Sequence, residues 1–111
     1  MTPNGPAEPR FAPAEPDLRA ALLAEVKAEA ARRILAAAPE WKQRNATARA
    51  VELIRKGEGA WTPEEAAEAA AIDLLWSRVK MIRAASDEIE GALMEAAPEA
   101  LGSFDIGAGW P

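Results

Sequence analysis

The stretch TPEEAAEAAAIDLLWSRVKMIRAASDEIEGAL, residues 62–93, carries the strongest structural signal in this chain. It opens with Thr62 as a helix N-cap, Pro63 at the first helical position and Glu65 at N3, where it completes a capping box. No further proline interrupts the stretch. The pattern predicts a single helix over residues 63–97, about 50 Å long at a rise of 1.5 Å per residue.

A heptad repeat of apolar residues runs along this helix and marks the face that it buries. Successive members are three or four residues apart, with one polar interruption at Ser86. We call them the seam residues: Ile72, Leu75, Val79, Ile82, Ile89 and Leu93. Two alternatives follow from the seam. It packs against other helices of the same chain, or it also faces further copies of the chain in a dimer or a trimer.

Two shorter helices are predicted upstream. Asp17 is a suitable N-cap for a helix over residues 17–38, in which apolar residues recur every four positions. Pro39 opens a second helix over residues 40–56, which Gly57 ends in a left-handed C′ conformation. We therefore expect an all-α fold: a three-helix antiparallel bundle with a long third helix, flanked by extended N- and C-terminal arms.

The two predicted arms lack helical periodicity. Residues 1–16 hold five of the nine prolines and predict an extended arm with a single large anchor, Phe11. Residues 98–111 predict an extended C-terminal tail. Its isolated large side chains are Phe104, Ile106 and Trp110. The N-terminal arm is expected either to be disordered or to lie over a neighbouring subunit. The C-terminal tail is expected either to lie on a surface through its three anchors or to be disordered.

The residue types that are missing restrict the chemistry of the chain. It contains no Cys, no His and no Tyr, which excludes the common zinc sites and nearly every nucleophile–base pair. We therefore expect no catalytic residue, no metal, no cofactor and no enzyme activity. The net charge of −5 disfavours nucleic acid as a partner, and no apolar run is long enough to span a membrane.

The apolar content of the chain predicts a thin core. Of the 111 residues, 28 are Ala and only 27 are larger apolar residues. Alanine favours helix but buries little area, so we expect partners to cover part of the surface. Beyond the arm anchors, the candidate partner contacts are Trp61, Trp76 and Met81. The alternative for these two tryptophans, as for Trp41, is that they fill the ends of the bundle.

A series of short motifs occurs in fixed order between Arg33 and Leu93. They are Trp41–Asn45, Ala48-Arg49 with Glu52-Leu53, Lys56–Glu58, Trp61-Thr62 with Glu64-Glu65, and Ile82–Asp87. Together with a Trp110-Pro111 ending, they resemble a helical segment of many tail proteins and tail-fibre assembly-like proteins of tailed phages and prophages. Two departures stand out: many such proteins carry a larger N-terminal part, and Ala46 stands where the pattern often has Met.

The resemblance implies a structural or assembly component of a phage virion, most closely associated with the tail fibre or the baseplate. It implies other phage structural proteins as partners, and a location in the virion or, during assembly, in the host cytoplasm. A capsid decoration or cement protein is one alternative. A tail-assembly chaperone that is absent from the mature particle is another.

Overall fold

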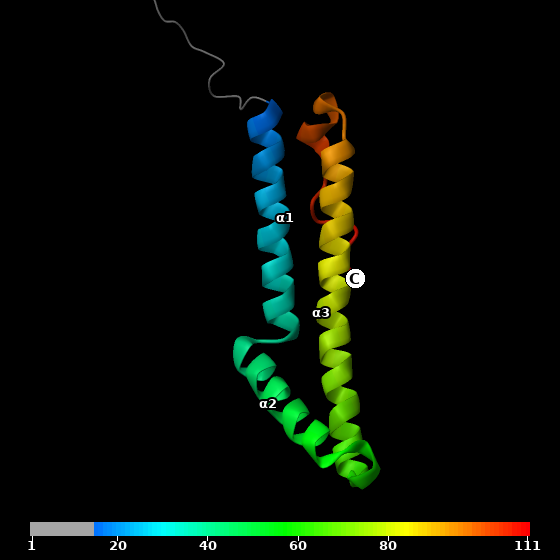
Figure 1. Cartoon of the computed structure of the whole chain (residues 1–111). Helices are drawn as coiled ribbons and strands as arrows, with labels where there is room; N and C mark the ends of the chain where they lie inside the picture. Colours follow the sequence, from blue (N-terminus) through cyan, green and yellow to red (C-terminus); the bar gives the residue numbers. More distant parts are fainter. Residues whose placement is uncertain (1–14) are drawn as a thin grey trace, which may run out of the picture.

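The computed structural model describes residues 15–111, which are almost entirely helical (Figure 1). The elements are α1 (Glu15–Ala37), α2 (Glu40–Lys56), the short 3-10 helix η3 (Glu58–Ala60), α3 (Pro63–Glu95) and the 3-10 helix η4 (Pro98–Ser103). No strand occurs in this part of the chain. The prediction of an all-α fold with three main helices, the third of them longest, is confirmed.

Helix α3 is the element against which both other long helices pack. Helix α1 lies antiparallel along its C-terminal half, and α2 runs obliquely along its N-terminal half (Figure 1). At about 1.5 Å per residue, the 33 residues of α3 are longer than the 23 of α1 or the 17 of α2, so the two shorter helices together are needed to cover it. The bundle is therefore an elongated helical hairpin, in which α1 and α2 follow one another along α3.

The bend between α1 and α2 lies at Ala38 and Pro39. The amide of Ala38 still donates to the carbonyl of Ile34, at 2.7 Å, but Pro39 has no amide hydrogen with which to continue the helix. Ala38 is fully buried, and its carbonyl accepts a hydrogen bond from the Gln43 side chain at 2.6 Å. The bend is thus a packed and hydrogen-bonded joint.

The predicted start of the first helix is wrong. Helix α1 begins at Glu15, so Asp17 lies within its first turn and does not act as the N-cap. The proline at position 16 is compatible with this start because the first amides of a helix have no intrahelical acceptor. The Phe11 anchor and the rest of residues 1–14 lie outside the described residues.

Of the two alternatives for the C-terminal tail, the structure shows the one in which it lies on a surface through its anchors, here the surface of its own chain; its first residues form the 3-10 helix η4 and are not extended. After α3 ends at Glu95, η4 reverses the chain, and the following residues run back beside α1 and α3 (Figure 1). Leu101 is 1% exposed and belongs to the same buried cluster as Val26 and Leu93. The tail folds back because its apolar side chains complete the core of their own chain.

The seam residues face inward. Val79, Ile82, Ile89 and Leu93 are buried, and Ile72 and Leu75 are half-buried. Ser86, the polar interruption, is buried as well, and its hydroxyl donates to Glu90 Oε2 at 3.0 Å. The hydrogen-bonding requirement of the Ser86 hydroxyl is therefore met within α3, by a residue one turn further along, and does not need a second copy of the chain.

A long-range contact closes the open end of the hairpin. The Arg19 side chain on α1 donates to the carbonyls of Leu93 and Met94 in the last turn of α3. No basic residue lies in that last turn itself. Arg19 thus supplies both hydrogen bonds and positive charge to the carbonyl end of α3, where a cation is favourable.

Gly57 ends α2 with a φ of +88° and a ψ of 135°. The expected positive φ is present, although ψ lies outside the left-handed helical region. A Cβ at this position would meet nothing within 4 Å, so any cost of a side chain is conformational.

We expect Gly57→Ala to lower the free energy of unfolding by about 1–3 kcal/mol, the usual cost of a backbone conformation that L residues avoid. Gly59→Ala is the matched control, because Gly59 has equally open surroundings and no positive φ. We expect it to change stability by about 0.5 kcal/mol or less. Urea unfolding followed by circular dichroism measures both, and equal losses would contradict the conformational explanation.

Candidate protein-interaction surface

A groove lies between the α1–α2 bend and the middle of α3, with a volume of about 1050 Å³. We call it the elbow groove. Its buried or half-buried lining comprises five apolar residues, Ala37, Ala46, Ile72, Leu75 and Ile82, and two arginines, Arg33 and Arg49. Because several of these belong to the seam, the groove is the stretch of the helix–helix interface that α1 and α2 leave open where they diverge.

A second stripe on α3 forms one wall of the elbow groove. Ala71, Leu74, Arg78 and Met81 each come one position before a seam residue and repeat at the same spacing of three and four. Leu74 is 72% exposed and Met81 is 56% exposed. Two large apolar side chains therefore stand in solvent beside the apolar lining of the groove.

The charged residues that line the groove are mostly basic. They are Arg33, Lys42, Arg49 and Arg78, with Glu68 as the one acidic residue. Arg33 pairs with Glu29 at 2.7 Å, and Arg49 pairs with Glu68 at 2.7 Å. Lys42 and Arg78 make no ion pair with any residue from 17 to 111. In a chain whose net charge is −5, the groove is a local concentration of positive charge.

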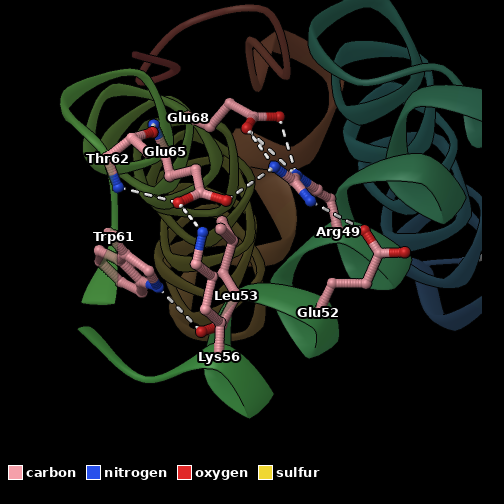
Figure 2. Close-up of polar contacts among 8 residues, drawn as sticks. All are labelled: Arg49, Glu52, Leu53, Lys56, Trp61, Thr62, Glu65 and Glu68. Atoms are coloured by element: carbon pink, nitrogen blue, oxygen red, sulfur yellow. Dashed lines mark hydrogen bonds and ion pairs between the residues drawn. The ribbon is translucent and has the colours of Figure 1, made fainter. Parts of the chain in front are cut away.

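The turn from α2 to α3 is held by a polar cluster, two of whose residues, Arg49 and Glu68, also line the groove (Figure 2). The Glu65 carboxylate accepts from the Thr62 amide at 2.8 Å, and the Glu65 amide donates to the Thr62 hydroxyl at 3.1 Å. The predicted capping box is confirmed. The same carboxylate accepts from Lys56 Nζ at 2.6 Å and lies 3.7 Å from the Arg49 guanidinium.

Arg49 links this turn to the elbow groove. Its guanidinium makes a two-pronged contact with Glu68 on α3, at 2.7 and 3.0 Å, and donates to Glu52 on its own helix at 3.0 Å (Figure 2). Planar pairing of this kind fixes the direction of an arginine side chain. Arg49 is therefore committed to holding α2 on α3, whereas Lys42 and Arg78 remain available to a partner.

The ion pairs of the turn lower the pKa of two carboxylates. The pKa of Glu65 is lowered first by its hydrogen bond to Lys56 and then by the Thr62 amide. The pKa of Glu68 is lowered by Arg49. In both cases the ionised form is favoured in the folded chain, so these groups stabilise the fold above their unfolded-state pKa, near 4.5.

This stabilisation is expected to disappear as the pH falls through the lowered pKa values, below about 4.5. Thermal unfolding between neutral and acidic pH should show a decrease in Tm there, and Glu65→Gln should make that decrease shallower. Glu88→Gln, an exposed position elsewhere on α3, is the control for the loss of one charge. An identical pH profile for Glu65→Gln and the unsubstituted chain would contradict the role of the turn cluster.

The structure places the predicted partner contacts apart from one another. Met81 lines the elbow groove. Trp76 is half-buried beside a separate shallow hollow and lies about 200° around α3 from Leu74, at 100° per residue. Trp61 is half-buried, and its ring N–H donates to the Leu53 carbonyl at 2.9 Å (Figure 2). Trp61 thus helps to close the α2–α3 turn.

The three tail anchors lie against their own chain. Phe104, Ile106 and Trp110 are partly buried on the core cluster. The Trp110 ring N–H donates to the Ile106 carbonyl at 2.8 Å, and the Arg33 guanidinium lies 5.0 Å from the centre of the Trp110 ring, a cation–π distance. Pro111 reaches the lining of the elbow groove. The tail therefore borders the groove without contributing its large side chains to it.

Sequence reasoning missed Leu74, Arg78 and Lys42 as groove residues. The signal for the first two was present, because the second stripe repeats with the same period as the seam. Lys42 could be assigned only once the bend at Pro39 had brought α2 across α3.

None of the described helices has a stretch that is both long and apolar enough to cross a bilayer. Residues 15–111 also contain no group of three or more side chains positioned to hold a metal ion. No family model, no curated protein and no solved structure matches this chain. The likeness to phage tail proteins rests on the sequence motifs alone.

Proposed function

We propose that this chain is a non-catalytic helical assembly protein that acts by binding other proteins. The observation that carries the proposal is the exposed apolar wall of the elbow groove, where Leu74 and Met81 line the same groove as Lys42 and Arg78, two basic residues that make no ion pair within residues 17–111. Apolar patches next to charged rims are typical of protein-binding surfaces. The fold does not need these side chains, since the buried core lies on the adjacent face of α3.

We place the protein in a phage particle, at the tail fibre or the baseplate, on the strength of its motifs. Several motif residues meet in the polar cluster of the α2–α3 turn, namely Arg49, Lys56, Trp61, Thr62 and Glu65. The resemblance therefore supports a shared helical hairpin more directly than a shared binding site. A capsid cement protein and a tail-assembly chaperone would use the same hairpin.

Mass spectrometry of purified particles tests this proposal. The chain should be found in tail fractions, at a stoichiometry comparable with that of other tail proteins, and deletion of its gene should leave tails incomplete. Recovery from capsid fractions alone would favour a decoration protein, and recovery only from unassembled lysate would favour a chaperone. A gene deletion with no effect on particles would contradict all three roles.

A further inference from the structure

We propose that the elbow groove binds an acidic amphipathic helix of a partner protein. This inference deepens the proposed function and rests on it, since it names the site and the chemistry of the partner. Three independent features of the groove support it: its shape, its charge and its continuity with the surface that the C-terminal tail already covers.

The shape of the groove fits a short helix laid along α3. The lining residues on α3 extend from Glu68 to Ile82, about 21 Å at 1.5 Å per residue, which corresponds to about four helical turns of a partner. Ala46 and Ala71 occupy little volume, so a partner backbone can approach closely. Leu74 and Met81 flank that path, and the unbranched Met side chain adapts to different apolar surfaces.

The charge of the groove selects an acidic partner. Lys42 comes from α2 and Arg78 from α3, and neither has an ion-pair partner in the described part of the chain. Glu or Asp on the flanks of a docked helix would neutralise both, whereas a basic helix would be repelled. A symmetric contact between two copies is disfavoured, because Arg78 at the centre of the stripe would approach its own counterpart.

The C-terminal tail indicates that this surface accepts an apolar segment. Residues 104–111 run beside α1 and α3, with Trp110 against Arg33, and Pro111 reaches the end of the groove. The chain thus covers one part of the interface between α1 and α3 with the apolar residues of its own tail. The neighbouring part, which the tail does not cover, is the elbow groove. A partner helix bound in the elbow groove would cover this neighbouring part in the same way as the tail covers the first.

The test uses two fluorescein-labelled helical peptides of about 16 residues, a length that spans the groove. Both carry Leu on one face; one carries Glu and the other Lys on the opposite face. Titration with the full chain, followed by fluorescence anisotropy, should show saturable binding of the Glu peptide, about tenfold or more tighter than the Lys peptide and weakened by salt.

Matched variants assign the binding to the groove. The double substitution Lys42→Glu and Arg78→Glu should weaken binding of the Glu peptide about tenfold or more. Arg55→Glu with Arg83→Glu makes the same change of charge at exposed sites that do not line the groove, and should leave the affinity unchanged. Leu74→Ser with Met81→Ser removes the apolar wall and should also weaken binding, with an unchanged circular dichroism spectrum.

The proposal is overturned if neither peptide binds, if both bind equally, or if the control pair weakens binding as much as the groove pair. It is also overturned if a single-stranded oligonucleotide binds to the chain and the groove substitutions abolish that binding. A third contrary result would be self-association in sedimentation that the double substitution Leu74→Ser and Met81→Ser abolishes. Incorporation of the variants into phage particles distinguishes a failure of the groove proposal from a failure of the proposed function. Unimpaired incorporation of the groove variants refutes the groove alone, whereas absence of the unsubstituted chain from particles and assembly complexes refutes the proposed function.

Discussion

Leu93→Ala is expected to lower the free energy of unfolding by about 2–5 kcal/mol, the range for removing a fully buried leucine. Leu93 is 0% exposed and lies in the cluster that joins α1, α3 and η4. Small domains are stable by only about 5–15 kcal/mol in total, and this core contains few large side chains. We expect the variant to lose a large share of its stability and to unfold at a much lower urea concentration than the unsubstituted chain.

Leu74→Ala provides a matched control, since it makes the same change on the same helix at a side chain that is 72% exposed. Its effect should be about 0.5 kcal/mol or less. Urea unfolding followed by circular dichroism measures both variants. A Leu74→Ala loss comparable to that of Leu93→Ala would show that the second stripe of α3 is buried in solution, which would also remove the basis for the elbow groove.

Leu101→Ala has the second-largest expected effect, a loss of about 2–4 kcal/mol together with release of the tail. Leu101 is the one fully buried side chain beyond α3, so it anchors residues 104–111 to the core. Loss of the Leu101 side chain should expose the peptide bond after Phe104 to chymotrypsin. Cleavage there should therefore be much faster in the variant than in the unsubstituted chain, because it follows local opening.

Glu99→Ala is the control for this experiment, since Glu99 lies in η4 beside the anchor but is exposed. Mass spectrometry of the digests reports release of the C-terminal peptide after Phe104, and urea unfolding reports stability. Equally rapid cleavage of all three chains at Phe104 would mean that the tail is undocked in solution.

Local patterns in the sequence predicted local structure well. The capping box at Thr62 and Glu65 formed as expected, because it joins atoms only three residues apart. The long helix followed from the same signal, and its end at Glu95 lies close to the predicted boundary. Gly57 took the expected positive φ, although its ψ of 135° is not that of the left-handed helical region.

The errors have a common physical cause, which is that long-range packing decides what a local pattern leaves open. Phe104, Ile106 and Trp110 show no period, so the sequence could not distinguish an arm that grips a neighbour from a tail that folds back. The elbow groove depends on the bend at Pro39 and on how far α1 and α2 diverge along α3, neither of which has a sequence period.

The hairpin also has a consequence for the order in which the chain folds during synthesis. Contacts at the α2–α3 turn join residues close in sequence, such as Trp61 and Leu53, eight apart, whereas Arg19 and Leu93 are 74 apart. Closing the longer loop costs more entropy, so we expect the turn to form first. A ribosome delivers α1 before either of its partners, the second half of α3 and Leu101. We therefore expect α1, the first long helix to be synthesised, to be the last to pack against the rest of the fold.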